Sequence, residues 1–218
     1  MSGPLILNGT DHAGDGVTQT AKSDLTAAYL AAEAQPVDTT VSADLAGQTL
    51  SPGVYFKGDG LQISGPVALT LDGGGDPNAV FVFKSGSTLV TSPNTTVSLI
   101  NGATACNVFW QVTSSTTLGV GSTFRGRILT LQNSTMDTGA TLEGSLLSRN
   151  GAVTLDQNTI LRPACASPVT AILAGGGSGG SGGTVETGGQ VARVPVGSVD
   201  AGGGPAAVVT RYRSVSAR

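Results

Sequence analysis

Charged and aromatic side chains are scarce in this sequence of 218 residues. Charged residues make up 11% of the chain and aromatic residues 4%, whereas an ordinary globular domain is about a quarter charged. The sequence has no basic run to bind phosphates and too few rings to stack on bases, so nucleic acid is excluded as a partner. No apolar stretch approaches the ~20 residues that cross a bilayer, so we expect no transmembrane segment.

Histidine and cysteine are also rare. The one histidine is His12, and the two cysteines are Cys106 and Cys165. Their spacing does not suit a metal, so we predict no metal site and no cofactor. The cysteines are either buried free thiols or a disulfide. We favour the disulfide, which could stabilise so long a loop by roughly 4 kcal/mol and which requires an oxidising compartment.

The sequence shows no catalytic constellation. Most acidic residues adjoin Gly or Pro, as turn aspartates do. Asp72 and Asp76 could share a calcium ion, but we interpret them as turn residues. His12 has no evident catalytic partner, and no serine lies in a nucleophile-elbow pattern. We therefore predict that the protein is not an enzyme.

Glycine, in contrast, is abundant, with 33 residues. From Thr39 to about Arg162, short apolar runs alternate with Gly, Asn, Asp and Pro, a pattern that predicts short strands joined by turns. One helix is predicted over residues 12–34, ending before Pro36. Its apolar stripe recurs every three to four residues and consists of Val17, Ala21, Leu25, Ala28, Tyr29 and Ala32.

A repeat of 18 residues runs through residues 121–160. Gly121-Ser-Thr-Phe is followed by Gly139-Ala-Thr-Leu and then by Gln157-Asn-Thr-Ile. A fixed period near 20 with short strands is typical of a solenoid, here a β-helix with coils of about 18 residues. Gly86-Ser-Thr-Leu and Gly102-Ala-Thr look like looser copies of the repeat upstream.

The repeat predicts which side chains face inward and which face outward, because side chains alternate along a strand. Two apolar stacks should point inward: Phe124, Leu142 and Ile160, and Leu118, Met136 and Leu155. Two threonine columns should point outward: Thr123, Thr141 and Thr159, and Thr117, Thr135 and Thr154. Threonine suits any exposed strand position, but two columns in register suggest a function.

Composition divides the chain into five segments. They are a short N-terminal lead (1–11), a flanking helix (12–34), a β-helix domain (39–165), a Gly/Ser linker (166–183) and a disordered tail (184–218).

Several stretches of the sequence resemble a known family. They are HAGD and DLTAAY within 12–29, DLAGQTLSPGVY (44–55), GDPNAVFVFKSGSTL (75–89), INGATACNVFWQV (100–112) and LEGSLLSRNGAVTLDQNTILRP (142–163). Together they are similar to the bacterial and fungal ice-binding (antifreeze) proteins, which have a discontinuous β-helix and a flanking helix. The resemblance implies a right-handed β-helix of triangular section, secretion, no cofactor, and adsorption to ice through one flat face.

The resemblance also bears on the ice site and on the start of the chain. The family's Thr-Ala/Gly-x-Thr/Asn motif matches Thr138-Gly-Ala-Thr141, and matches 120–123 and 156–159 in part. Family members carry several strands, and usually a signal peptide, before the helix. Only about ten residues precede His12, so we expect a truncated chain with one coil end exposed.

Both threonine columns and Thr138 are therefore candidate ice-binding residues. Arg125 and Glu143 flank the Thr123 column, where charge would disturb an ice-matching face, whereas Asp137 and Arg149 lie near the Thr117 column. The sequence leaves the choice of face open. We expect a secreted monomer whose partner is the ice surface. The alternative is a cell-surface adhesion or structural module tethered through its linker and tail.

Overall fold

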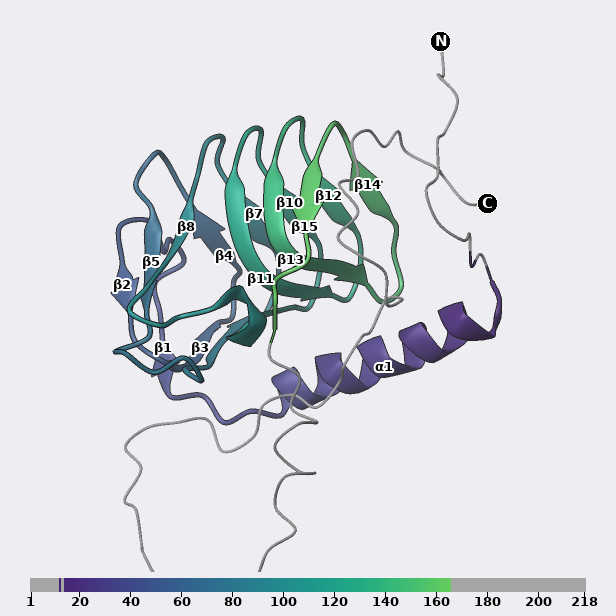
Figure 1. The fold of residues 1–218 in the computed structure, drawn as a ribbon, viewed down its shortest axis with the longest axis horizontal. Helices are drawn as coiled ribbons and strands as arrows, with labels where there is room; N and C mark the ends of the chain where they lie inside the picture. The colour runs from purple at the N-terminus through teal and green to yellow at the C-terminus, as the bar shows by residue number, and fades with distance from the viewer. Residues whose placement is uncertain (1–11, 13, 166–218) are drawn as a thin grey trace, which may run out of the picture.

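The computed structural model describes residue 12 and residues 14–165, which form three parallel β-sheets and one long helix (Figure 1). Sheet A has the order β1 (Thr39–Thr40), β3 (Gly53–Lys57), β6 (Phe81–Ser85), β9 (Val108–Val112), β11 (Thr123–Thr130), β13 (Thr141–Ser148) and β15 (Thr159–Leu161). Sheet B has the order β14 (Val153–Leu155), β12 (Ser134–Met136), β10 (Thr116–Leu118), β7 (Leu89–Thr91) and β4 (Leu61–Ile63). Sheet C has the order β2 (Thr49–Leu50), β5 (Leu69–Asp72) and β8 (Val97–Ile100). The predicted β-helix is thus confirmed. The predicted lead, linker and tail lie outside the described residues.

The coils are not all of the same length. In the last coils Thr123 pairs with Thr141 and Thr141 with Thr159, which is the repeat read from the sequence. The earlier coils are longer, because they contain separate sheet C strands and loops between sheets C and A. The prediction that Gly86 and Gly102 begin upstream copies of the repeat is therefore wrong. Gly86 lies between β6 and β7, and Gly102 lies in the loop after β8. The residue that bridges to Thr123 is Thr96.

Two stacked glycines let β11 and β13 turn a corner without a loop. Gly126 and Gly144 are partners in adjacent strands. Gly126 has a φ of +113°, in a region that favours glycine. A Cβ atom on Gly144 would lie 1.8 Å from the carbonyl oxygen of Gly126. Only glycine allows the backbones of successive coils to approach so closely at this corner.

Aromatic rings form a continuous stack inside the solenoid. Tyr55, Phe83 and Trp110 are paired across β3, β6 and β9. Their ring centroids are 5.3 Å and 4.0 Å apart, and Phe124 extends the stack at 4.9 Å from Trp110. The Trp110 Nε1 atom donates a 3.0 Å hydrogen bond to the carbonyl oxygen of Arg125, so this buried polar group is satisfied.

The two predicted inward stacks are confirmed in the complete coils. Phe124, Leu142, Leu118 and Met136 are all buried in the main core. Their partners in the last coil, Leu155 and Ile160, face the same way but are only half-buried.

Helix α1 (Gly16–Glu33) covers the outer side of sheet A (Figure 1). Its buried residues are Leu25, Ala28, Tyr29 and Ala32, which pack on Val54, Val80, Val82, Phe109 and Leu129. The predicted apolar stripe is therefore buried from Leu25 onward, whereas Val17 is 54% exposed. Among the described residues, no helix is long and apolar enough to cross a membrane.

Side chains hold both ends of α1. At its start, Asp15 caps the backbone N–H of Thr18 at 3.0 Å and contacts the His12 ring at 2.8 Å. The hydrogen bond from the Thr18 backbone, followed by that from His12, lowers the pKa of Asp15. At its end, the Lys84 Nζ atom donates to the carbonyl oxygens of Glu33 and Gln35 at 2.6 Å and 2.9 Å. Lysine is favourable here because it neutralises the negative end of the helix dipole.

The predicted disulfide is confirmed. Cys106 lies in the short 3₁₀ helix η1 (Ala105–Asn107), and Cys165 follows β15; the two are joined across a sequence separation of 59. The bond therefore ties the segment that leaves the last coil to the middle of the solenoid.

The corner glycines yield a first prediction. Gly144→Ala should lower the free energy of unfolding by about 2 kcal/mol or more, because the added methyl group collides with backbone rather than with a movable side chain. Gly16→Ala is the control, since nothing lies within 4 Å of its added Cβ atom, and it should not destabilise the fold. Guanidinium unfolding measures both. If Gly144→Ala were as stable as the parent, the close approach of the coils would be contradicted.

The disulfide yields a second prediction. Replacing Cys106 and Cys165 together by serine should reduce the free energy of unfolding by up to about 4 kcal/mol, because the unfolded chain regains the freedom of a long loop. A reducing agent should shift the parent protein to the same unfolding midpoint and leave the double variant unchanged. Identical midpoints for parent and variant without reductant would contradict this account.

Candidate functional site

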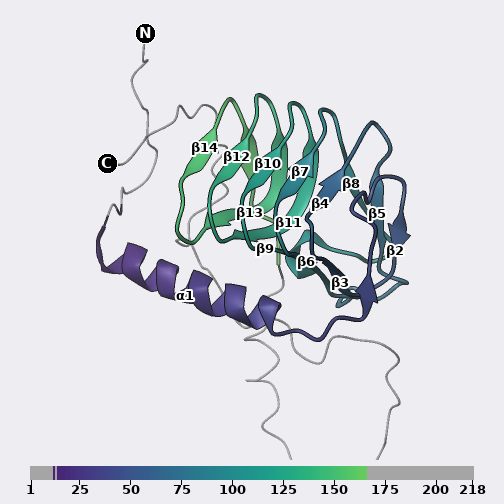
Figure 2. The same cartoon turned by 180° about the vertical axis from the view of Figure 1, so that it is seen from behind.

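The outward side of sheet B, here called the B face, carries one of the two threonine columns. Its central column consists of Gln62, Val90, Thr117, Thr135 and Thr154, one residue from each strand. The residues on either side of Thr117 and of Thr135 in β10 and β12 are buried, which shows that the column itself points outward. Figure 2 shows the five strands side by side, away from α1.

The three threonines of the B face are held in strict register. Thr117 pairs with Thr135, and Thr135 with Thr154. Neighbouring strands lie ~4.8 Å apart, so their methyl and hydroxyl groups form a regular ladder. Val90 continues the ladder with a side chain of the same shape as threonine, and the β-branch of both residue types limits rotation about χ1.

The central column of the B face is uncharged. Two positions before Thr117 and Thr135 lie Ser115 and Asn133, which are also neutral. Charge occurs at the opposite margin, where Asp137 and Asp156 follow β12 and β14. Asp156 accepts a hydrogen bond from the Thr138 hydroxyl, which places Thr138 at this margin rather than in the central column.

Arg149 does not disturb the B face, although it lies close to that column in the sequence. Its guanidinium carbon lies 5.9 Å from the centroid of the Tyr29 ring. Because Tyr29 is buried between α1 and sheet A, Arg149 is directed toward the helix side of the molecule.

Hydroxyl groups also brace the B face from within. The Thr116 and Thr130 hydroxyls lie 2.9 Å apart in a buried hydrogen bond. One coil later, Ser148 donates to Ser134 at 2.8 Å in the same arrangement. The sequence analysis did not find these pairs; the only signal was that each pair recurs after 18 residues. They join sheets A and B at their corner and so restrict movement of the B face.

The second threonine column also exists, and the structure extends it by one residue. Thr96 bridges to Thr123, which pairs with Thr141 and then with Thr159. Arg125 and Glu143 lie beside this column, as the sequence indicated, but they bind each other: the Arg125 Nε atom lies 3.0 Å from the Glu143 Oε2 atom. Arg125 also donates to the carbonyl oxygen of Val97 at 2.7 Å.

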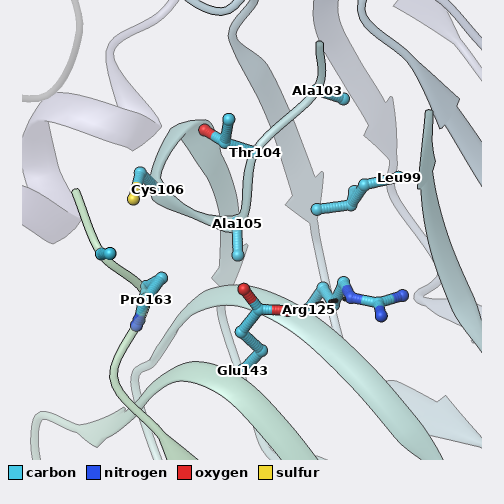
Figure 3. A pocket seen from close by; sticks show the side chains of 9 residues that line it. Leu99, Ala103, Thr104, Ala105, Cys106, Arg125, Glu143 and Pro163 are labelled. Atoms are coloured by element: carbon cyan, nitrogen blue, oxygen red, sulfur yellow. Dashed lines mark hydrogen bonds and ion pairs between the residues drawn. The ribbon is translucent and has the colours of Figure 1, made fainter. Parts of the chain in front are cut away.

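The surface beside the second column is hollowed rather than flat. A cavity of about 380 Å³ lies there. Figure 3 shows Cys106 and Pro163 on one side of it, and Leu99 and Arg125 on the other. The disulfide holds residues 163–165 over this part of the molecule. The second column therefore adjoins a hollow rather than an unbroken flat surface.

The acidic residues with possible calcium-binding spacing have turn roles instead. The Asp72 Oδ1 atom accepts hydrogen bonds from the Gly74 backbone and the Asn101 side chain, both at 2.9 Å. The bond from Gly74 lowers the pKa of Asp72 most, followed by the bond from Asn101. Asp76 accepts from the backbone of Asn78 at 2.8 Å. Within the described part of the chain, no group of three or more potential ligands could hold a metal ion.

Comparison with known proteins agrees with this architecture. The model of the family described as "Ice-binding-like" matches residues 1–161. An ice-binding protein from Nostoc sp. (strain HG1) is 45% identical over 159 residues, which cover 72% of this chain and 58% of the relative. Ice-binding protein 1 of Shewanella frigidimarina (strain NCIMB 400) is 32% identical over 178 residues, covering 72% of this chain and 20% of that protein. The chain thus spans little more than half of the first relative and a fifth of the second.

Solved structures show the same fold. The crystal structure of an ice-binding protein from an Antarctic biological consortium superposes with a TM-score of 0.65 at 44% identity, covering 66% of each chain. That of an ice-binding protein from the Antarctic ascomycete Antarctomyces psychrotrophicus superposes with a TM-score of 0.61 at 40% identity, covering 65% of this chain and 69% of the other. By its sequence and its fold, this chain belongs to the ice-binding-like protein family.

Proposed function

We propose that the protein adsorbs to ice through the B face and thereby inhibits ice growth or recrystallisation. The observation that carries this proposal is the ladder of Thr117, Thr135 and Thr154 in adjacent parallel strands. The ladder is uncharged, braced from inside and free of the covering helix.

The chemistry of such a face suits ice. Threonine hydroxyls hydrogen-bond to water, and the methyl groups beside them exclude water from defined positions. Hydrogen bonds through ordered water are nearly as favourable as direct ones. Each contact is weak, so adsorption requires many contacts in a fixed array. The solenoid supplies that array before it meets the ice, and this reduces the entropy lost on binding.

The wider functional context follows from the same features. We propose that the protein is a monomer and that it is secreted. The Cys106–Cys165 disulfide supports secretion, because it is suited to an oxidising environment. We also propose that the protein acts by adsorption and not by catalysis, in keeping with its family. The alternative adhesion role depended on the linker and tail, and none of the relatives found is named for adhesion.

Substitution on the B face tests the proposal. Thr135→Tyr places a bulky ring in the middle of the ladder, so thermal hysteresis should fall several-fold. The matched control is Thr70→Tyr. Thr70 is half-buried, as Thr135 is, but it lies on a strand of sheet C. This variant should therefore leave thermal hysteresis unchanged. Both variants are compared with the parent at equal concentration, with circular dichroism to verify folding.

The second threonine column provides the contrasting outcome. We expect Thr141→Tyr to affect thermal hysteresis much less than Thr135→Tyr does. If a folded Thr141→Tyr variant lost activity while Thr135→Tyr kept it, the ice-contact surface would be the Thr123 column instead. If the folded parent showed neither thermal hysteresis nor recrystallisation inhibition at high micromolar concentration, ice binding itself would be contradicted.

A further inference from the structure

The Cys106–Cys165 disulfide lies at the surface, next to a positive charge. Cys165 is exposed and Cys106 is half-buried. The Nη2 atom of Arg127 lies 3.7 Å from the Sγ atom of Cys165. A cation adds little to the stability of an intact disulfide, because the sulfur atoms carry no net charge until the bond breaks. The position of Arg127 therefore matters most for the chemistry of bond breakage.

The guanidinium group of Arg127 is supported by the sheet. Arg127 lies on β11, where it pairs with Phe109 of β9. Its guanidinium carbon lies 5.9 Å from the centroid of the Phe109 ring. Phe109 is buried in the cluster between α1 and sheet A, so the ring is a fixed support. The positive charge is thus held beside Cys165 by the fold itself.

The cavity of about 380 Å³ gives access to the other cysteine. Cys106 lines this cavity together with Pro163 and Ala164, which precede Cys165 (Figure 3). Ligand cavities of this size accept molecules much larger than a small thiol. An external thiol can therefore approach Cys106 while the solenoid remains folded.

We propose that this disulfide is a thiol-exchange site, at which an external thiol bonds to Cys106 and Cys165 leaves as the thiolate. In such an exchange, the sulfur that is not attacked departs, and it departs faster when its thiolate is more stable. A neighbouring guanidinium stabilises a thiolate. Because Arg127 contacts Cys165, charge selects Cys165 as the leaving group.

A low-molecular-weight thiol is the only co-reactant that the exchange requires. Its thiolate forms a bond to the Sγ atom of Cys106, the Cys106–Cys165 bond breaks, and the electron pair remains on Cys165. A second external thiolate then attacks the mixed disulfide and leaves as an external disulfide, and Cys106 takes up a proton. The protein disulfide is thereby reduced by two electrons, and two external thiols are oxidised.

Exchange changes what covers the cavity. The disulfide holds residues 163–165 over this part of the molecule, so its opening releases them from Cys106. The pairing of β11 with β13 and the ladder on the B face do not involve the disulfide. The site thus makes the cover of the cavity sensitive to thiols and leaves the B face unchanged.

Trapping of the mixed disulfide tests which sulfur is attacked. The folded parent is exposed briefly to 2-mercaptoethanol, excess iodoacetamide stops the reaction, and peptides are mapped by mass spectrometry. The mercaptoethanol adduct should lie on Cys106 and the alkyl group on Cys165. Exposure alone predicts the opposite, because Cys165 is the more exposed cysteine. An adduct mainly on Cys165 would overturn the proposal.

The rate of reduction tests the role of Arg127. Arg127→Gln should slow the reduction of the folded protein by 2-mercaptoethanol about three-fold or more, because the leaving thiolate loses its cation. Arg127→Lys keeps the charge and should restore part of the rate. Arg149→Gln is the matched control, since its guanidinium carbon also lies 5.9 Å from an aromatic ring, that of Tyr29. This variant should be reduced at the rate of the parent.

Loss of structure cannot imitate the expected result. Unfolding exposes a disulfide and speeds its reduction, whereas the proposal requires slower reduction of Arg127→Gln. A rate for Arg127→Gln equal to or above that of the parent would contradict the proposal. Thermal hysteresis is not measured in either experiment, so both outcomes are independent of the ice-binding proposal.

Discussion

Parallel stacking of successive coils in register is the constraint on which this structure depends. Each strand hydrogen-bonds to the corresponding strand of the next coil, so a side chain in one coil lies directly on its counterpart in the next. This places aromatic rings on aromatic rings inside and threonine on threonine outside. It also demands glycine where backbones turn together, as at Gly126 and Gly144. The same geometry that builds the core therefore builds the array on the B face.

The remaining elements determine which surface stays available. Helix α1 covers sheet A, and Lys84 fixes its far end to that sheet. The disulfide draws residues 163–165 over the cavity beside Arg125 and Glu143. Sheet B is left as the regular side with an uncharged central column. Buried hydroxyl pairs at its corner, Thr116 with Thr130 and Ser134 with Ser148, hold it in place.

Much of this architecture could be predicted from the sequence, because the repeat at residues 121–160 is nearly exact. It correctly gave the pairing of Thr123 with Thr141 and of Thr117 with Thr135. The repeat did not predict the pairing before residue 121, because loops of different length separate the sheets there. A local Gly-x-Thr match, such as that at Gly86, therefore does not mark an equivalent position. The ion pair of Arg125 with Glu143 and the inward direction of Thr116 depend on contacts between coils. A single threonine has no property that reveals which side it faces.

The most direct test of the central claim is partition of the protein into growing ice. A single ice crystal is grown slowly in a dilute solution of the fluorescently labelled protein and of a variant with Tyr at 117, 135 and 154. If the B face binds ice, the parent enters the crystal and the folded variant remains in the liquid. If the variant enters the crystal as readily as the parent, or if the folded parent is excluded from it, the B face is not an ice-binding surface.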